Sequence, residues 1–196
     1  MDKTSLGMYL REIDNYKLLS ANEEKDLAMR IKKGDAVARQ KLIESNLRLV
    51  VSIAKHYKGT ALTFQDLIQE GNLGLMHAVD KFDPDLGYRF STYATWWIKQ
   101  AITRAISDKG KTIRTPAHIV DKILKVKKVE RELMVKTGRE ITSSDIAEET
   151  GFTVKQVELL KSYTQEVASL DVPVDDDEET TMGALIEDTS IMGPAE

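Results

Sequence analysis

Two adjacent tryptophans, Trp96 and Trp97, are the side chains of this sequence that most clearly suggest a binding chemistry. At about 100° per residue, a helix over 91–106 places them on the side opposite an aliphatic stripe. The side chains that share their side, here called the aromatic face, are Tyr93, Trp96, Trp97, Gln100, Thr103 and Arg104. Rings on which bases stack, interleaved with hydrogen-bond donors, suit single-stranded nucleic acid. The structural alternative is that the tryptophans pack beneath another segment.

A second helix, expected over 63–79, also has two different sides. An apolar stripe faces inward and consists of Phe64, Leu67, Ile68, Gly71, Leu75, Ala78 and Val79. The opposite side, here called the acidic face, consists of Asp66, Gln69, Glu70, Leu73, Met76, His77 and Asp80. An apolar centre with a charged rim is typical of protein interfaces, although an ordinary solvated surface fits the same pattern. His77 is interpreted as a surface residue rather than a ligand or base.

The elements that position these faces are helices, since the alternation typical of strands is almost absent. Ser20 followed by Glu23 is a capping box that begins a helix, and Gly34 ends it. Asp35 begins a long helical segment that reaches Ala54. Further helix starts are indicated, in chain order, at Thr63 with Asp66, Ser91, Thr115-Pro116, Thr142 and Thr153.

The helical pattern predicts an all-α protein with a boundary in the loop at 107–114. We expect a larger helical domain over 1–107, a small three-helix domain over 108–166, and a linker over 167–196. Beyond Leu170, two prolines and an acidic run interrupt any periodicity. That segment is expected to be extended or disordered in the isolated chain.

The net charge of −4 conceals two opposite segments. Residues 171–196 carry nine acidic side chains and neither lysine nor arginine, which leaves 28 basic against 23 acidic side chains over residues 1–170. Between Tyr88 and Lys136, 12 basic side chains stand against four acidic ones. Basic stretches bind nucleic acid by displacing its counterions, although a solvated helix surface has the same composition.

Several classes of protein are excluded by what the 196 residues lack. There is no cysteine, which excludes disulfide scaffolds and thiol catalysis and fits a reducing cytosol. The three histidines are scattered without metal-ligand spacing, and no glycine-rich phosphate loop or GxSxG motif occurs. No apolar run approaches the roughly 18–20 residues of a membrane span. We therefore expect a cytoplasmic protein with no enzymatic activity, cofactor or metal.

The segments DLIQEGNLGLMHAVDKFD (66–83) and GYRFSTYATWWIKQAITRAI (87–106) closely resemble the bacterial primary-type sigma factors of RNA polymerase, the sigma-70 family. The likeness extends to YLREI (9–13), NLRLVVSIAKHY (46–57), TIRTPAHIVDKI (112–123) and LDVPVDDDEETTMGALIEDTS (170–190). These stretches resemble regions 1.2, 2.1 to 2.4, 3.0, 3.1 and 3.2. The resemblance implies sigma domain 2 with region 1.2, a three-helix sigma domain 3 and an acidic finger. Regions 1.1 and 4 have no counterpart, so we expect a piece of a longer protein.

The resemblance also implies partners. The residues that match positions docking on the clamp coiled coil of the polymerase β′ subunit are Asp66, Gln69, Glu70, Asn72 and Met76. The acidic run 175–179 matches the finger that enters the active-site cleft of the polymerase. Anti-sigma factors are a further implied class of partner, and the implied location is the cytoplasm, in association with the nucleoid.

For the aromatic face, the resemblance implies recognition and melting of the promoter −10 element. The residues that would hold the non-template strand are Tyr88, Phe90, Thr92, Tyr93, Trp96 and Trp97, with Tyr93 stacking on a flipped adenine. The residues expected to contact DNA farther upstream are Gln100, Thr103, Arg104, Arg114, His118 and Asp121. Asp121 is one methylene shorter than the glutamate common in the family. The basic residues at 122, 125, 127 and 128 lie near phosphates or form a solvated face.

Two other functions fit parts of the pattern. Residues 142–165 resemble a helix-turn-helix, which would make the chain a duplex-binding repressor. A cluster of Arg, Asn or Gln at the start of a recognition helix is absent there, which argues against direct base reading. Alternatively, the aromatic face grips a partner helix, which would make the chain a protein-only adaptor indifferent to DNA.

Overall fold

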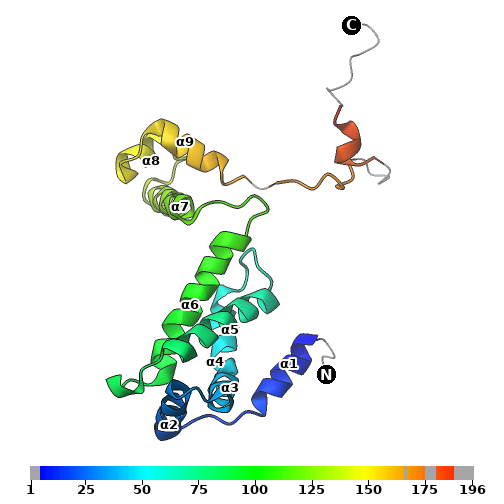
Figure 1. Ribbon diagram of the computed structural model, residues 1–196. Coiled ribbons are helices and arrows are strands. Elements are labelled where there is room, and N and C mark those ends of the chain that lie inside the picture. Colours follow the sequence, from blue (N-terminus) through cyan, green and yellow to red (C-terminus); the bar gives the residue numbers. More distant parts are fainter. Residues whose placement is uncertain (1–4, 166, 175–179, 188–196) are drawn as a thin grey trace, which may run out of the picture. The chain divides into compact units, whose positions relative to one another are not determined.

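The computed structural model describes residues 5–165, 167–174 and 180–187, and it confirms the all-α fold class (Figure 1). Packing divides the chain into two compact units, residues 1–121 and residues 122–196. The helices of the first unit are α1 (Ser5–Asp14), α2 (Ala21–Lys32), α3 (Ala36–Glu44), α4 (Leu47–Ala54), α5 (Phe64–Lys81) and α6 (Phe90–Lys109). The division falls inside α7 (Ala117–Thr137), whereas the boundary expected after residue 107 lies near the end of α6.

Side-chain caps begin α2, α3 and α5 where the sequence predicts them. The capping box of Ser20 and Glu23 is present at α2, and Asp35 accepts hydrogen bonds from the amides of Val37 and Ala38 at α3. Thr63 likewise accepts from the amide of Asp66 at α5. The prediction of Ser91 as a cap is wrong, because α6 begins one residue earlier and the carbonyl of Ser91 already lies within the helix, where it accepts from Thr95 Oγ1.

The long helix expected from Asp35 to Ala54 is two helices, α3 and α4. Asn46 separates them, with φ −112° and ψ 2°, outside helical geometry. Its side-chain amide donates to the carbonyl of Leu42 at 2.8 Å and so satisfies an acceptor at the end of α3. Asparagine often competes with the helix for backbone partners in this way.

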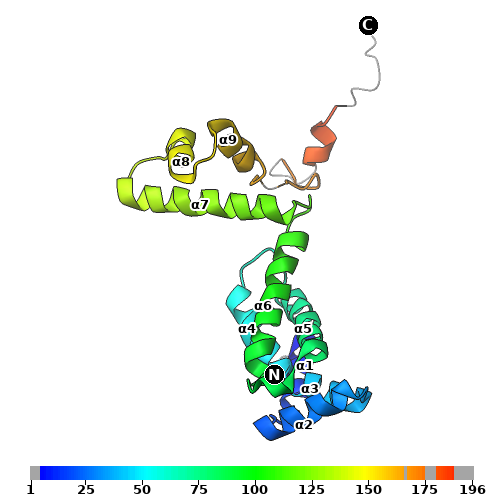
Figure 2. The same cartoon turned by 60° about the vertical axis from the view of Figure 1, so that its left-hand side comes forward.

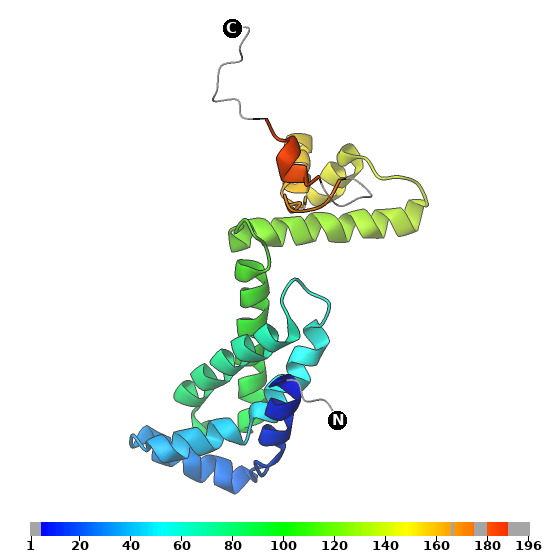
Figure 3. The same cartoon turned by 90° about the vertical axis from the view of Figure 1, so that its right-hand side faces the viewer.

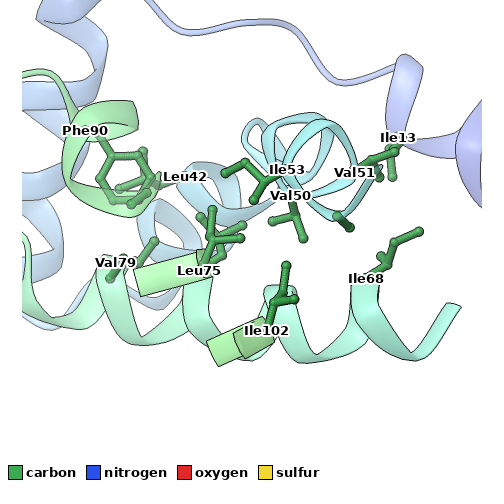
Figure 4. Close-up of a cluster of buried hydrophobic side chains, with 14 of the residues drawn as sticks. Ile13, Leu42, Val50, Val51, Ile53, Ile68, Leu75, Val79, Phe90 and Ile102 are labelled. Carbon is green, nitrogen blue, oxygen red and sulfur yellow. The ribbon is translucent and has the colours of Figure 1, made fainter. Parts of the chain in front are cut away.

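One hydrophobic core holds the first unit together. Its fully covered side chains include Leu42, Leu67, Leu75, Phe90 and Ile102. Figure 4 shows Phe90 beside Leu42 at one end of this cluster and Ile13 of α1 at the other. Burying one such side chain stabilises the fold by about 1.5–3 kcal/mol. Figure 3 shows α1 beside α4, so the N-terminal helix belongs to this core.

The most extensive helix packing of the unit is between α5 and α6, which are joined by a turn containing the 3₁₀ helix Pro84–Leu86 (Figure 1). Two glycines of α5 allow the close approach. A Cβ on Gly74 would lie 2.6 Å from the carbonyl oxygen of Trp97, and one on Gly71 would lie 2.6 Å from Cγ1 of Val50. The spacing predicts Gly71 on the inward stripe, whereas the close approach at Gly74 is a finding of the structure.

The second unit contains the remainder of α7 with α8 (Ser143–Thr150) and α9 (Val154–Ser162), which lie along one side of α7 (Figure 2). Its core side chains are Ile123, Val126, Ile141, Ile146, Val157 and Leu160. Gly151 has φ 77° and ends α8 in the left-handed region, where glycine is favoured. Lys161 of α9 pairs with Glu130 of α7 at 2.9 Å.

The segment after Leu170 has more local order than expected. The amide of Val174 donates to the carbonyl of Thr180, and the amide of Met182 donates to that of Val172, around an isolated bridge between Pro173 and Thr181. A 3₁₀ helix follows at Met182–Leu185. Residues 170–174 and 180–187 thus form a turn, a bridge and a short 3₁₀ helix where the sequence predicts an extended or disordered chain. The acidic run 175–179 lies outside the described residues.

Candidate nucleic-acid and partner interfaces

Aromatic rings from the turn before α6 and from its first two turns form a connected cluster. The ring centroids of Phe82 and Phe90 lie 5.2 Å apart, and those of Phe82 and Tyr93 lie 5.9 Å apart. Tyr93 meets Trp97 at 6.3 Å, and Trp97 meets Trp96 at 4.8 Å with an interplanar angle of 89°. Edge-to-face contacts at these distances are favourable. These contacts therefore help to fix the geometry of the aromatic cluster.

The aromatic side chains of the cluster and the neighbouring Tyr88 differ greatly in exposure. The side chains of Tyr88 and Trp96 are 73% and 60% exposed, whereas Tyr93 and Trp97 are half-buried. Phe90 is completely buried, so its ring supports the surface from below and offers no face to a base. Its expected role in holding the DNA strand therefore has no support in this geometry. Trp96 and Tyr88 carry the accessible aromatic surface.

Trp97 packs against α5 as well as against the other aromatic rings of α6. Its ring meets the imidazole of His77 on α5 edge to face, with 4.2 Å between centroids. Within the described residues, its buried indole Nε1 has no hydrogen-bond partner. An unsatisfied buried donor destabilises a fold by about 1–3 kcal/mol. The alternative that a tryptophan packs against another helix thus holds for Trp97 but not for Trp96.

A carboxylate not predicted from the sequence anchors the start of α6. Glu24 of α2 is only 5% exposed and accepts hydrogen bonds from Arg89 Nε at 3.0 Å and Nη2 at 2.8 Å. It also accepts from the backbone amide of Phe90 at 3.1 Å. The signal was present in the sequence, because Glu24 lies three and four residues before Leu27 and Ala28 on the inward side of α2.

The polar members of the candidate DNA-binding set are mostly exposed. These are Thr92, Gln100, Thr103, Arg104, Arg114, His118 and Asp121. Asp108 pairs with Arg104 at 3.6 Å and with Arg114 at 3.0 Å, so two of the expected DNA contacts share one acidic partner. His118 and Asp121 lie three residues apart on α7, close enough to share one face of that helix.

The acidic face of α5 is outward, as expected, but its carboxylates are already engaged. Glu70 accepts a hydrogen bond from Lys109 at 2.6 Å, and Asp80 accepts two from Arg39 at 2.7 and 3.0 Å. The Arg39 guanidinium holds the pKa of Asp80 below its usual range. Leu73 is 56% exposed at the centre of the face, and Met76 is half-buried beside it.

Asn72, the fourth residue of the expected polymerase-binding set, contacts the acidic face as well as α1, because its amide Nδ2 donates to Gln69 Oε1 at 3.4 Å. Its amide Nδ2 lies 3.3 Å from the hydroxyl of Tyr9 on α1. Its Oδ1 is buried without a hydrogen-bond partner within the described ranges. Asn72 therefore joins α5 to α1, while Asp66, Gln69, Glu70 and Met76 remain together on the outward side.

Among the basic residues at 122, 125, 127 and 128 of α7, one lysine contacts other elements of the second unit. Lys125 donates to the carbonyl of Thr150 at the end of α8 at 3.1 Å, and its ammonium lies 5.1 Å from the ring centroid of Phe152. Lys122, Lys127 and Lys128 are exposed, and Lys128 lies 3.8 Å from Glu132. Lys125 is exposed as well, but its ammonium is engaged within the second unit.

Other kinds of site find no support in the described part of the chain. His, Asp and Glu side chains do not gather in a group of three or more that could hold a metal ion, as far as residues 5–165, 167–174 and 180–187 show. None of the helices in those ranges combines the length and the apolar character that a bilayer span requires.

Comparison with known protein families identifies the class to which this arrangement of helices belongs. Sigma-70 factor region 1.2 matches residues 5–36, Sigma-70 region 2 matches residues 42–112, and Sigma-70 region 3 matches residues 121–196. Together these matches cover most of the chain in the order typical of the family. The chain belongs to the sigma-70 family.

The chain is also similar to curated sigma factors. It is 50% identical over 189 residues to the RNA polymerase sigma factor SigA of a Bacillus species. It is 52% identical over 189 residues to the RNA polymerase sigma factor SigA of Clostridium acetobutylicum. In both comparisons the match covers 96% of this chain and 50% of the relative, so the chain spans about half the length of these proteins.

Proposed function

We propose that this chain acts in transcription initiation as the part of an RNA polymerase sigma factor that binds core polymerase and recognises the promoter −10 element. The observation that carries the proposal is the aromatic cluster on α6, with Trp96 60% exposed beside the outward face of α5. Its place in region 2 of the sigma-70 family supports the same conclusion. The proposed activity is binding, without a catalytic step.

On the DNA side, exposed rings would capture bases of the non-template strand after they leave the stack. Trp96 and Tyr88 have open faces for stacking, and Tyr93 at the edge of the cluster would receive a flipped adenine. Stacking of a base on an aromatic ring contributes about 1–3 kcal/mol. Several captured bases would therefore supply the free energy that strand opening at A·T steps requires.

On the polymerase side, the α5 surface formed by Asp66, Gln69, Glu70, Leu73 and Met76 would dock on the clamp coiled coil of the β′ subunit. An exposed apolar centre with a polar rim is the usual composition of such an interface. Leu73 is 56% exposed and supplies that centre. Asn72 would contribute indirectly, because it contacts Tyr9 of α1.

The remaining assignments belong to the same proposal. Arg114, His118 and Asp121 would contact DNA upstream of the −10 element, and all three are exposed. The acidic run 175–179, outside the described residues, would enter the active-site cleft of the polymerase. Binding to anti-sigma factors and association with the nucleoid also follow from the family and are proposed with it.

The test is fluorescence anisotropy with a labelled single-stranded oligonucleotide of the −10 non-template sequence. The whole chain is titrated with the oligonucleotide in the presence and absence of core RNA polymerase, and a scrambled oligonucleotide serves as the control. We expect selective binding that core polymerase strengthens greatly. Tight binding to duplex alone would favour the repressor function, and indifference to DNA would favour the adaptor function.

Variants separate the two surfaces. Trp96→Ala is expected to reduce oligonucleotide binding by roughly tenfold, the effect of losing one stacked base, while core binding stays the same. Glu70→Gln is expected to weaken core binding while circular dichroism remains unchanged. If Trp96→Ala reduced core binding and oligonucleotide binding equally, the division of roles between α5 and α6 would be wrong.

A further inference from the structure

Glu70, a carboxylate of the proposed polymerase-binding surface, already has a basic partner within the chain. The Nζ of Lys109, the last residue of α6, lies 2.6 Å from Glu70 Oε1. The Glu70 side chain is 19% exposed, whereas that of Lys109 is 61% exposed. The lysine therefore reaches from solvent onto a carboxylate that is mostly covered. The hydrogen bond that Lys109 donates to Glu70 raises the pKa of the Lys109 ammonium.

The other carboxylates of the acidic face are held in different ways. Arg39 grips Asp80 with two nitrogens, Nε and Nη2, one on each carboxylate oxygen. Asp66 accepts a hydrogen bond of 2.6 Å from the hydroxyl of Thr63, which carries no charge. A guanidinium fork fixes its partner in one geometry, whereas a lysine is a flexible point charge. Glu70–Lys109 is thus the ion pair of this face that an incoming basic group opens most easily.

We propose that Lys109 is an internal counter-ion of this surface, which core polymerase displaces from Glu70 with a basic side chain of its own. The inference rests on the function proposed above and adds a residue that sets the strength of docking. In the free chain, Lys109 neutralises Glu70 and so reduces its attraction for a basic partner. In the complex, the partner takes the place of Lys109, whose exposed ammonium returns to water.

The size of the effect follows from the exposure of the lysine. Ion pairs with an exposed member change equilibrium constants by no more than about fivefold. Removing the competitor is therefore expected to strengthen docking about two- to fivefold. Salt screens exposed charges, with a Debye length of about 10 Å at 0.1 M. The advantage of removing Lys109 should therefore shrink as the salt concentration rises.

The experiment measures binding of the fluorescently labelled chain to core RNA polymerase at low and high salt. The chains compared are wild type, Lys109→Gln, Lys109→Arg, Glu70→Gln and the double variant with both glutamines. Lys33→Gln is the matched control, because Lys33 is an exposed lysine at the end of α2 whose loss changes the net charge equally. Circular dichroism confirms that each variant is folded.

We expect Lys109→Gln to bind about two- to fivefold more tightly at low salt, Lys109→Arg to bind no more tightly than wild type, and Lys33→Gln to match wild type. In the Glu70→Gln background, Lys109→Gln should have a smaller effect, because only the weaker attractions of Lys109 to Asp108 and Asp66 remain. Weakened or unchanged binding of Lys109→Gln, or an equal gain with Lys33→Gln, overturns the inference while leaving the proposed function intact. Unchanged core binding of Glu70→Gln overturns both the docking surface and the inference.

Discussion

The imidazole of His77 and the indole of Trp97 meet edge to face with 4.2 Å between their centroids, and they join α5 to α6. On the same pair of helices, the backbone at Trp97 lies against Gly74. The acidic face and the aromatic face are therefore two surfaces of one rigid helix pair. A change in the packing of α5 on α6 moves the aromatic cluster, whereas a change at the exposed ring of Trp96 does not disturb the core.

This difference predicts opposite behaviour for the two tryptophans. Trp96→Ala should change the free energy of unfolding by less than about 0.5 kcal/mol, because exposed positions contribute little. Trp97→Ala should lower it by about 2–4 kcal/mol, because it removes a half-buried ring and its contact with His77. Urea unfolding followed by circular dichroism measures both. Equal losses of stability would show that the two rings are packed alike in solution.

The helices and their caps could be predicted from the sequence because the signals are local. The pairs Ser20–Glu23 and Thr63–Asp66 specify helix starts through hydrogen bonds within four residues. The inward stripes of α5 and α6 were also predictable, because a helix of 3.6 residues per turn sorts its sides by sequence alone. Both faces named from the sequence consequently exist in the fold, although their members differ in exposure.

What could not be predicted depends on contacts between distant residues. The sequence groups Phe90 with the aromatic side chains expected to contact DNA, yet its ring is buried beside Leu42 of another helix. Lys109 neutralises Glu70 from a position 39 residues away. No periodicity within one helix reveals which residue of a second helix supplies a counter-ion. Sequence spacing thus identifies the sides of a helix but not their partners.

Gly74 is predicted to be intolerant of a methyl group. Alanine is intrinsically better than glycine in a helix by about 1 kcal/mol. Here its Cβ would lie 2.6 Å from the carbonyl oxygen of Trp97 and 2.8 Å from Cβ of Ala101. Because one obstacle is backbone, α6 must shift, and overpacking of this kind costs about 1–3 kcal/mol.

We therefore expect Gly74→Ala to lower the melting temperature and to change the tryptophan fluorescence spectrum. Gly34→Ala is not a suitable control, since Gly34 has φ 88° and would be strained by any side chain. A better control is Ser52→Ala, at an exposed position on α4. A Gly74→Ala protein as stable as wild type would mean that α6 can move without loss of packing.

Glu24 is predicted to set the stability of the junction between α2 and α6. Its carboxylate accepts three hydrogen bonds from Arg89 and Phe90 while only 5% exposed. Glu24→Gln keeps the shape of the side chain but removes its charge. The amide nitrogen of the new side chain then faces the N–H donors of Arg89 or Phe90 and cannot accept their hydrogen bonds. We expect a loss of about 1–3 kcal/mol in the free energy of unfolding, measured by urea denaturation.

The neighbouring acid Asp26 provides the comparison for Glu24. It lies two residues further along α2 and is exposed. Asp26→Asn should leave stability within about 0.5 kcal/mol of wild type. If both substitutions had the same small effect, Glu24 would not be desolvated in solution as its contacts indicate.

The stability of the first unit is predicted to fall at acid pH. Arg39 holds the pKa of Asp80 below its ordinary value of 3.8, and Lys32 does the same for Asp83. Because the folded pKa values are depressed, the unfolded chain binds more protons in this range. The stabilisation by these pairs is complete well above pH 4 and is lost as the pH falls through the folded pKa values.

Thermal unfolding between pH 7 and pH 3 tests this directly. We expect a melting temperature that is nearly constant from pH 7 to about 5 and that falls steeply below about 4. Asp80→Asn should lower the melting temperature slightly at pH 7. The corresponding loss in the free energy of unfolding should be less than about 1 kcal/mol, because the ion pair is half exposed. The difference between the variant and the wild type should shrink as the pH falls through the folded pKa of Asp80, since protonation removes the charge that attracts Arg39. A constant difference across the whole range would show that Asp80 acts through packing rather than through its charge.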